Sequence, residues 1–345
     1  MYQFRVFIKD ALDLDDLPIA SSVCLAFSIT KDLLSVATSS FRLLDIPTNI
    51  KEGDVLGLVD PYGTIIYTGV INSISDTIQC RDITAIFNDQ WKWWDPTGKT
   101  TIETKLKKII EDDFVGSSDP MVADRFPFTV TATSTTSAGF ETQEDTTVLD
   151  FQAFLMQAYD LYGIKTEIAI PYGTGTPTID LKKATHASIK VGNNVLPVQN
   201  MTPLTEVFET NKLVIYTDDG LTLRGTYYAT TGGVTTSSSS PLRPPVTKTK
   251  YIFNTDDALV DIVKANLQDQ IYNHKITFDL LLNNGLYDFY TWELGMPLEI
   301  WYNGAYYSTI FTKYNLRKEI NTDVAAVSIT CGKVRNTLTE RLNAR

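Results

Sequence analysis

The chain has 345 residues, of which 43% are hydrophobic, and this length allows about two to four compact domains with apolar cores. Its 41 acidic residues outnumber the 30 basic ones, giving a net charge of −11, and no cluster of Lys and Arg is present to neutralise phosphates. We therefore expect no sequence-specific nucleic-acid binding and no attraction to anionic membrane surfaces. No run approaches the ~20 apolar residues of a membrane-spanning helix, so no such segment is expected.

The cysteines and the amino terminus indicate the compartment of synthesis. Cys24, Cys80 and Cys331 are too few and too scattered for a disulfide framework or a metal knuckle. The apolar start, residues 1–8, is followed by Lys9-Asp10 and lacks a small-residue cleavage site, so a secretory signal is not expected. We interpret the cysteines as small buried hydrophobic residues of a protein made in a reducing cytoplasm.

Residues 1–95 are predicted to form a first β domain. Strands at Val23–Phe27 and Ser39–Leu44 lead into a hairpin that begins at Gly53. The turn sequence Asp95-Pro96-Thr97-Gly98 then marks a domain boundary.

Residues 96–195 are predicted to form an inserted α+β domain. A helix capped by Thr100 or Thr101 places Ile102, Leu106 and Ile109 on one face. The predicted elements, in order, are that helix to about Asp112, a Thr-rich β-like stretch over 129–136, a helix after Thr146-Thr147 that ends at Gly163 as a left-handed C-cap, and a strand over 164–170.

Residues 196–250 are predicted to be a mixed segment, and residues 251–345 a helix followed by a second β domain. The mixed segment has a short helix at Thr202-Pro203, a hairpin over 213–223 and an exposed Ser/Pro-rich loop over 230–249. The final part has a helix from Asp256-Asp257 to about Gln270, then strands at 276–282 and 324–331.

One pattern occurs near both ends of the chain. Gly53, Leu56 and Leu58 recur as Gly295, Leu298 and Ile300 at a constant offset of 242. Each copy continues through a Gly-containing turn into a second strand and closes on Ile-x-Cys, at Ile78–Cys80 and Ile329–Cys331. A glycine, two alternating strands and a tight turn are typical of a β-hairpin. The recurrence favours two copies of one small β-barrel, although antiparallel barrels can also reuse these residue types by chance.

The search for catalytic chemistry finds no candidate catalytic, cofactor-binding or metal-binding residue. The two histidines, His186 and His274, lie far apart and lack partners at metal-ligand spacing. Gly98-Lys99-Thr100 has Trp93 where a phosphate-binding loop needs its first glycine, and Ser28-Ile29-Thr30-Lys31 lacks the motifs that accompany Ser-x-x-Lys. The acidic doublets at 112–113, 218–219 and 256–257 are explained by helix ends and turns.

The aromatic residues leave two other functions open. Tyr302, Tyr306 and Tyr307 could form a platform for sugars, although such residues more often cover a core or a subunit contact. A β-rich receptor- or carbohydrate-binding tail protein is therefore one alternative. A carboxylate-dependent cell-wall glycosidase is a weaker one, because no doublet needs a catalytic explanation.

The two hairpins and the segment before the second one resemble the bacteriophage baseplate hub and tail-tip proteins, a family that includes the amino-terminal hub part of tail-associated lysins. The resemblance rests on Gly53–Leu56 with Tyr67-Thr68-Gly69, on Gly295–Leu298 with Tyr306-Tyr307, and on the helix from Asp256 with the following 272–278. The second copy departs from the first at Met296-Pro297. The layout extends over nearly the whole chain.

The resemblance implies an α+β, β-dominated fold with two tail-tube-like β-barrels and inserted small α+β domains. It implies a homotrimer that adapts a threefold tip to a sixfold tail tube and surrounds the channel for DNA and the tape-measure protein. Expected partners are the distal tail or tube ring, the tape measure, and a spike or fibre, all in the virion. We expect no enzyme domain and no cofactor, and an acidic channel wall that repels DNA.

Overall fold

The computed structural model describes most of the chain. The residues outside the description are 8–17, 88–89, 93–100, 120–127, 134–147, 171–175, 184–187, 193–197, 203–204, 207–209, 231–232, 239–248, 255–258, 268–273, 283, 303–304, 323, 325 and 334–345. The predicted turn at 95–98, the histidine at 186 and the start of the helix at 256–257 therefore lie outside the described residues.

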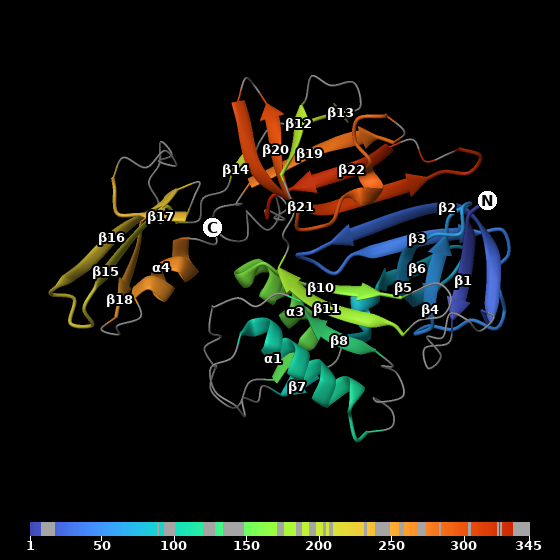
Figure 1. The fold of residues 1–345 in the computed structure, drawn as a ribbon, viewed down its shortest axis with the longest axis horizontal. Coiled ribbons are helices and arrows are strands. Elements are labelled where there is room, and N and C mark those ends of the chain that lie inside the picture. Colours follow the sequence, from blue (N-terminus) through green and yellow to red (C-terminus); the bar gives the residue numbers. More distant parts are fainter. Residues whose placement is uncertain are drawn as a thin grey trace.

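Six strands of the amino-terminal region form a closed β-barrel (Figure 1). They are β1 (Gln3–Phe7), β2 (Ala20–Asp32), β3 (Thr38–Leu43), β4 (Val55–Val59), β5 (Ile65–Ile74) and β6 (Ile78–Asp82). Their order is β1-β4-β5-β6-β3-β2, every pairing is antiparallel, and pairing of β1 with β2 closes the ring. Closure leaves no free edge around the ring itself, as a small barrel requires.

The carboxyl-terminal region repeats this strand order. Its strands are β12 (Ile189–Gly192), β13 (Val198–Gln199), β14 (Thr205–Glu206), β19 (His274–Leu281), β20 (Pro297–Tyr302), β21 (Ala305–Lys318) and β22 (Ala326–Cys331). The order β12-β20-β21-β22-β19-β13 matches that of the first barrel, with β14 following β13 along β19. β12 runs parallel to β20, whereas β1 runs antiparallel to β4. Among the described residues, no pairing of β12 with β13 closes the second ring as β1 with β2 closes the first.

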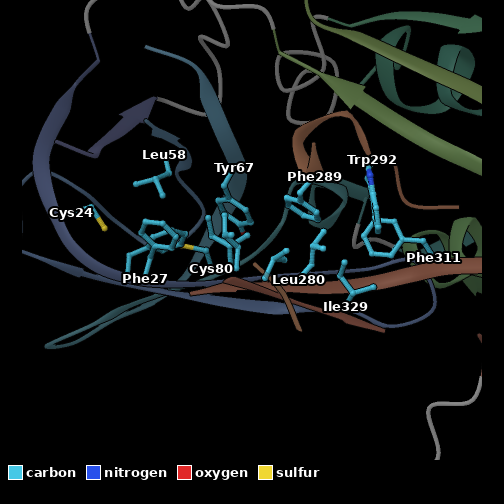
Figure 2. Packing of buried hydrophobic residues seen from close by; sticks show 14 of the residues in the cluster. Cys24, Phe27, Leu58, Tyr67, Cys80, Leu280, Phe289, Trp292, Phe311 and Ile329 are labelled. Carbon is cyan, nitrogen blue, oxygen red and sulfur yellow. The ribbon is translucent and has the colours of Figure 1, made fainter. Parts of the chain in front are cut away.

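A single hydrophobic core extends through both barrels. Phe4, Phe41 and Tyr67 of the first barrel and Phe278 and Phe311 of the second are at most 1% exposed and belong to one cluster. Figure 2 shows part of this cluster, including Tyr67 of the first barrel and Leu280 and Phe311 of the second. Alternate residues point inward, as in β3, where Ser39, Phe41 and Leu43 are buried and their neighbours are not. The shared core makes the two barrels one rigid packing unit.

The inserted domain follows the first barrel. It contains a 3₁₀ turn η1 (Ile83–Phe87), β7 (Gln90–Lys92), α1 (Ile102–Ile109), β8 (Thr129–Ala132), β9 (Val148–Asp150), α3 (Phe151–Tyr162), β10 (Ile164–Ala169) and β11 (Thr178–Lys183). β10, β11 and β8 form a sheet, and α1 and α3 share a buried apolar cluster with it.

The caps of the two helices test the sequence prediction directly. Thr101 caps α1 by accepting a hydrogen bond from the Thr104 backbone N–H, and Gly163 ends α3 at φ 70°; both predictions are confirmed. The predicted start of the second helix is wrong. Asp150 rather than a threonine is its cap, because the Asp150 carboxylate accepts a hydrogen bond from the Ala153 N–H at 2.9 Å. Val148 lies on β9, where it pairs with Lys92 of β7.

A separate small sheet carries the next part of the chain. β15 (Lys212–Tyr216), β16 (Leu223–Thr230), β17 (Gly233–Thr235) and β18 (Thr249–Phe253) form it, and α4 (Leu259–Leu267) packs against it. Two predictions for residues 196–250 are wrong. Gly233–Thr235 is a strand inside the predicted loop because it pairs with β16, and the short helix expected at Thr202 is replaced by β14, which pairs with β19. Residues 203–204 of that expected helix lie outside the description.

Candidate functional site

The glycine that opens each repeat copy has the same geometry in both barrels. Gly53 and Gly295 each have φ 91°, a left-handed conformation that favours glycine. The N–H of Gly53 donates to the Ile71 carbonyl at 2.9 Å, and that of Gly295 donates to the Phe311 carbonyl at 2.7 Å. The departure at Met296 leaves this turn intact, since the next N–H donates to the carbonyl three residues back in both copies.

The second strand of each hairpin carries the same irregularity. The ladder between β5 and β6 shifts register between Ile71 and Ser73, and the ladder between β21 and β22 shifts between Phe311 and Lys313. On the partner strand, Ile71 faces Cys80 and Phe311 faces Cys331. The repeated Ile-x-Cys therefore marks equivalent strands. The second hairpin is two residues shorter, so the offset of 242 holds for its first strand only.

The aromatic centre of each barrel is also repeated. Phe41 of β3 faces Ile78 of β6, and Phe278 of β19 faces Ile329 of β22. All four side chains are at most 1% exposed. Shared turn, bulge and core positions confirm that the two barrels have matching architecture.

The two barrels join through one continuous antiparallel pairing of β2 with β21. It runs from Phe27 opposite Lys318 to Asp32 opposite Lys313 (Figure 1). The Asn315 Nδ2 donates to Ser28 Oγ at 2.9 Å and to Thr30 Oγ1 at 2.8 Å. We call this pairing the barrel junction, and it is the candidate functional site because it fixes how one barrel is placed beside the next.

A lysine side chain makes a polar contact at each end of the barrel junction. The Lys313 Nζ lies 3.5 Å from Asp32 Oδ2, and the Asp32 side chain is 0% exposed. The Lys318 Nζ at the other end donates to the Leu25 carbonyl at 2.9 Å. A buried carboxylate needs such partners, because burial without them costs several kcal/mol (about 3–5 when one partner is removed).

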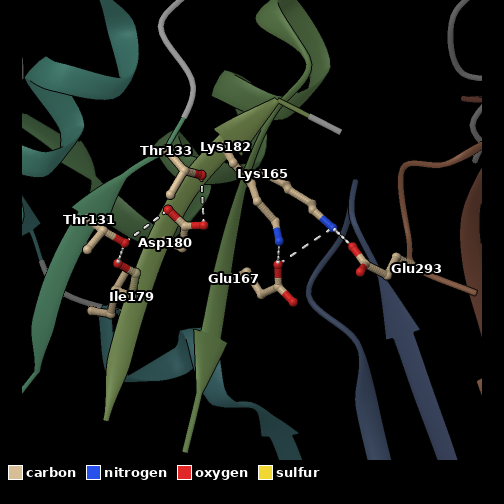
Figure 3. Close-up of polar contacts among 8 residues, drawn as sticks. All are labelled: Thr131, Thr133, Lys165, Glu167, Ile179, Asp180, Lys182 and Glu293. Atoms are coloured by element: carbon tan, nitrogen blue, oxygen red, sulfur yellow. Dashed lines mark hydrogen bonds and ion pairs between the residues drawn. The ribbon is translucent and has the colours of Figure 1, made fainter. Parts of the chain in front are cut away.

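An ion pair between Lys165 and Glu293 joins the inserted domain to the second barrel. The Lys165 Nζ, whose side chain is 6% exposed, lies 2.6 Å from Glu293 Oε2 and 3.8 Å from Glu167 Oε2 (Figure 3). Lys182 also pairs with Glu167. The Glu293 carbonyl accepts from the Met296 N–H in the repeated turn, so the insert contacts the second barrel where its repeat begins.

Sequence reasoning did not identify the barrel junction. Ser28 and Thr30, which were considered only as part of a Ser-x-x-Lys motif, lie on β2 and receive hydrogen bonds from Asn315. β2 is 13 residues long, more than the expected strand at Val23–Phe27, and its second half extends onto the neighbouring barrel.

The remaining candidate residues have structural positions. His274 is buried, its Nε2 lies 2.6 Å from Thr309 Oγ1, and burial lowers its pKa to about 4. Asp219 lies in the β15–β16 turn, where it accepts hydrogen bonds from the Thr217 hydroxyl and the Leu221 N–H, which lower its pKa. The doublet at 112–113 lies in the helical turn after α1.

The tyrosines considered for a sugar platform differ in their surroundings. Tyr306 is 52% exposed, but its ring packs edge-on against Trp301 at 4.8 Å, and Tyr307 is partly buried against the barrel core. The side chain of Tyr302 lies outside the described residues. The three cysteines are buried and unpaired by disulfides, and burial raises the pKa of Cys24 to about 12.

Within the described residues, no three or more His, Cys, Asp or Glu side chains gather to hold a metal ion. The helices among them are too short or too polar to cross a membrane. No protein-family model and no curated protein matches the sequence.

Solved structures with the same fold extend over nearly the whole chain. A tail protein from Neisseria meningitidis MC58 matches with TM-score 0.59 and 13% identity, covering 96% of both chains. The 43 kDa tail protein of prophage MuSo2 from Shewanella oneidensis matches with TM-score 0.58 and 13% identity, over 96% of this chain and 97% of that one. A chain of the phage P2 virion baseplate in its activated conformation matches with TM-score 0.51 and 13% identity, over 98% of this chain and 100% of that one.

These likenesses agree with the repeated barrels and with the β-dominated architecture. They confirm the fold that the sequence resemblance implied. The chain therefore has the fold of the phage tail and baseplate proteins.

Proposed function

We propose that this protein is the structural hub of a phage tail tip or baseplate, acting as a homotrimeric ring. The observation that carries the proposal is the doubled barrel: each chain brings two barrels of matching strand order, turn and bulge. Three such chains bring six similar units, and a threefold assembly can then meet a sixfold tube.

The proposed partners follow from this geometry. One face of the ring contacts the distal tail or tube ring, and the other carries a spike or fibre, with the end of the tape-measure protein in the channel. The virion is then the site of action, as it is for the phage P2 baseplate chain with the same fold. The domain boundaries at 95, 195 and 250 remain our proposal.

The net charge of −11 supports a passive role in genome passage. An acidic channel wall repels the phosphate backbone, so DNA passes without being held. We propose no catalytic step, because His274, Asp219 and the acidic doublet at 112–113 have structural positions.

Size-exclusion chromatography with light scattering tests the proposal. The expected result is a particle of three times the 38.6 kDa chain mass, at protein concentrations in the micromolar range or above. A species that stays monomeric at all concentrations refutes the homotrimeric ring. Sugar binding by a monomer would instead support the carbohydrate-binding alternative, and wall hydrolysis lost on replacing one carboxylate would support the glycosidase.

A further inference from the structure

The barrel junction begins where the repeat turn ends. Phe311 exchanges backbone hydrogen bonds with Gly295 and Met296, and this is the last contact of β21 with the turn before β20. Immediately beyond it, the Thr312 carbonyl accepts from the Leu33 N–H at 3.0 Å, and β2 occupies the edge of β21 from there on. The second barrel thus offers one open strand edge, and the first barrel covers it.

The first barrel has the same edge without a cover. Ile71 exchanges hydrogen bonds with Gly53 and Asp54, as Phe311 does with its turn. Beyond Ile71, no strand among the described residues pairs with β5 on that side. Asn72 is exposed, whereas its counterpart Thr312 is 0% exposed under β2. We call residues 72–75 the open β5 edge.

The second barrel also has a counterpart of β2. β14 pairs with β19 as β2 pairs with β3, and Thr205 lies opposite Lys275. Ser28 faces Ser40, so the same register sets Thr30 opposite Thr38. Ser39 faces Cys80 as Ile276 faces Cys331, so Thr38 is the β3 position equivalent to Lys275. Thr205 therefore corresponds to Thr30, the residue that faces Asn315 in the barrel junction.

We infer that the open β5 edge of one copy receives β14 of a second copy of this chain, in antiparallel pairing with Thr205 opposite Ser75. Ser75 is the counterpart of Asn315, since Ile74 faces Ile78 as Tyr314 faces Ile329. The contact joins different surfaces of the two copies, so repeating it produces a ring when the rotation closes. This inference rests on the proposed homotrimer and names the strands that build it.

The two junctions differ in length. β21 continues through six pairings with β2 to Lys318, whereas β5 ends at Ile74 and the chain turns back at Ser75–Thr77. Only two of the six pairings have counterparts on β14, at Thr205 and Glu206. The contact between copies is therefore shorter than the contact within a chain, and the ring should separate into intact monomers before the barrels separate.

Disulfide trapping tests the pairing. The variant Ser75→Cys with Thr205→Cys places two thiols on facing residues, and facing Cα atoms of antiparallel strands are about 4.5–5.5 Å apart, within the range of a disulfide. The matched control is Thr30→Cys with Asn315→Cys, the equivalent pair inside one chain. The native cysteines are buried, so they do not compete for oxidation.

Under mild oxidation, the Ser75→Cys, Thr205→Cys variant should form covalent dimers and trimers on a denaturing gel, reversed by reductant. The control pair should close within the chain at unchanged mass, and either cysteine alone should give no ladder. A wild-type trimer whose variant forms no ladder, while the control pair closes, overturns this inference and leaves the proposed function standing. Absence of any trimer by light scattering overturns both.

Discussion

Replacement of the repeat glycines tests whether the two barrels share one turn. Gly53 and Gly295 each have φ 91°, where a side chain is unfavourable by about 1–2 kcal/mol. A Cβ on Gly53 meets nothing within 4 Å, so no steric clash adds to this cost. Alanine also restricts the unfolded chain and regains about 0.4–1 kcal/mol. The net loss expected for Gly53→Ala is therefore about 1 kcal/mol, and Gly295→Ala should lose a similar amount.

Thermal and urea unfolding followed by tryptophan fluorescence measure these losses. A loss of 1 kcal/mol lowers the melting temperature of a unit of this size by about 2–4 °C. The matched controls are Gly53→Asn and Gly295→Asn, which should be less destabilising because asparagine tolerates the left-handed region. Unchanged stability in either alanine variant, or losses that differ by more than about 1 kcal/mol, would refute the shared turn.

Other substitutions test the core, the buried histidine and the contact of the insert. Phe41→Ala and Phe278→Ala should each cost about 3–5 kcal/mol in urea unfolding, because both rings are almost fully buried; a cost below about 1 kcal/mol in either contradicts equivalent cores. Burial lowers the pKa of His274 from 6.5 to about 4, so the unfolded state binds the proton first, and stability present above pH 6.5 should fall by up to about 3 kcal/mol as the pH drops toward 4. His274→Gln should flatten that part of the pH profile, and an unchanged profile contradicts the assignment. Lys165→Met should cost about 1–3 kcal/mol and speed proteolysis of the insert, with little further effect of Glu293→Gln; additive effects would show that the two side chains do not interact.

The sequence was most informative where a local rule decides the structure. Gly53, Gly163 and Gly295 occupy conformations that favour glycine, and their positions predicted the two hairpins and the end of α3 correctly. Thr101 was one of two threonines predicted as a cap, because a hydroxyl before an apolar helical face can accept a hydrogen bond from a backbone N–H of the first helical turn.

Prediction failed where distant pairing overrides local preference. Thr205 follows a proline that favours a helix start, yet it forms a strand because β19 offers a free edge. Gly233–Thr235 lies in a polar segment and becomes a strand by pairing with β16. The barrel junction depends on contacts between residues almost 290 positions apart, which no local pattern records.

Electron microscopy of the purified protein tests the central claim most directly, because it shows how many barrels surround an axis. The account predicts class averages with threefold symmetry, in which six similar densities enclose a central pore. Particles that consist of a single chain, or rings in which the two barrels do not alternate around the pore, would contradict it.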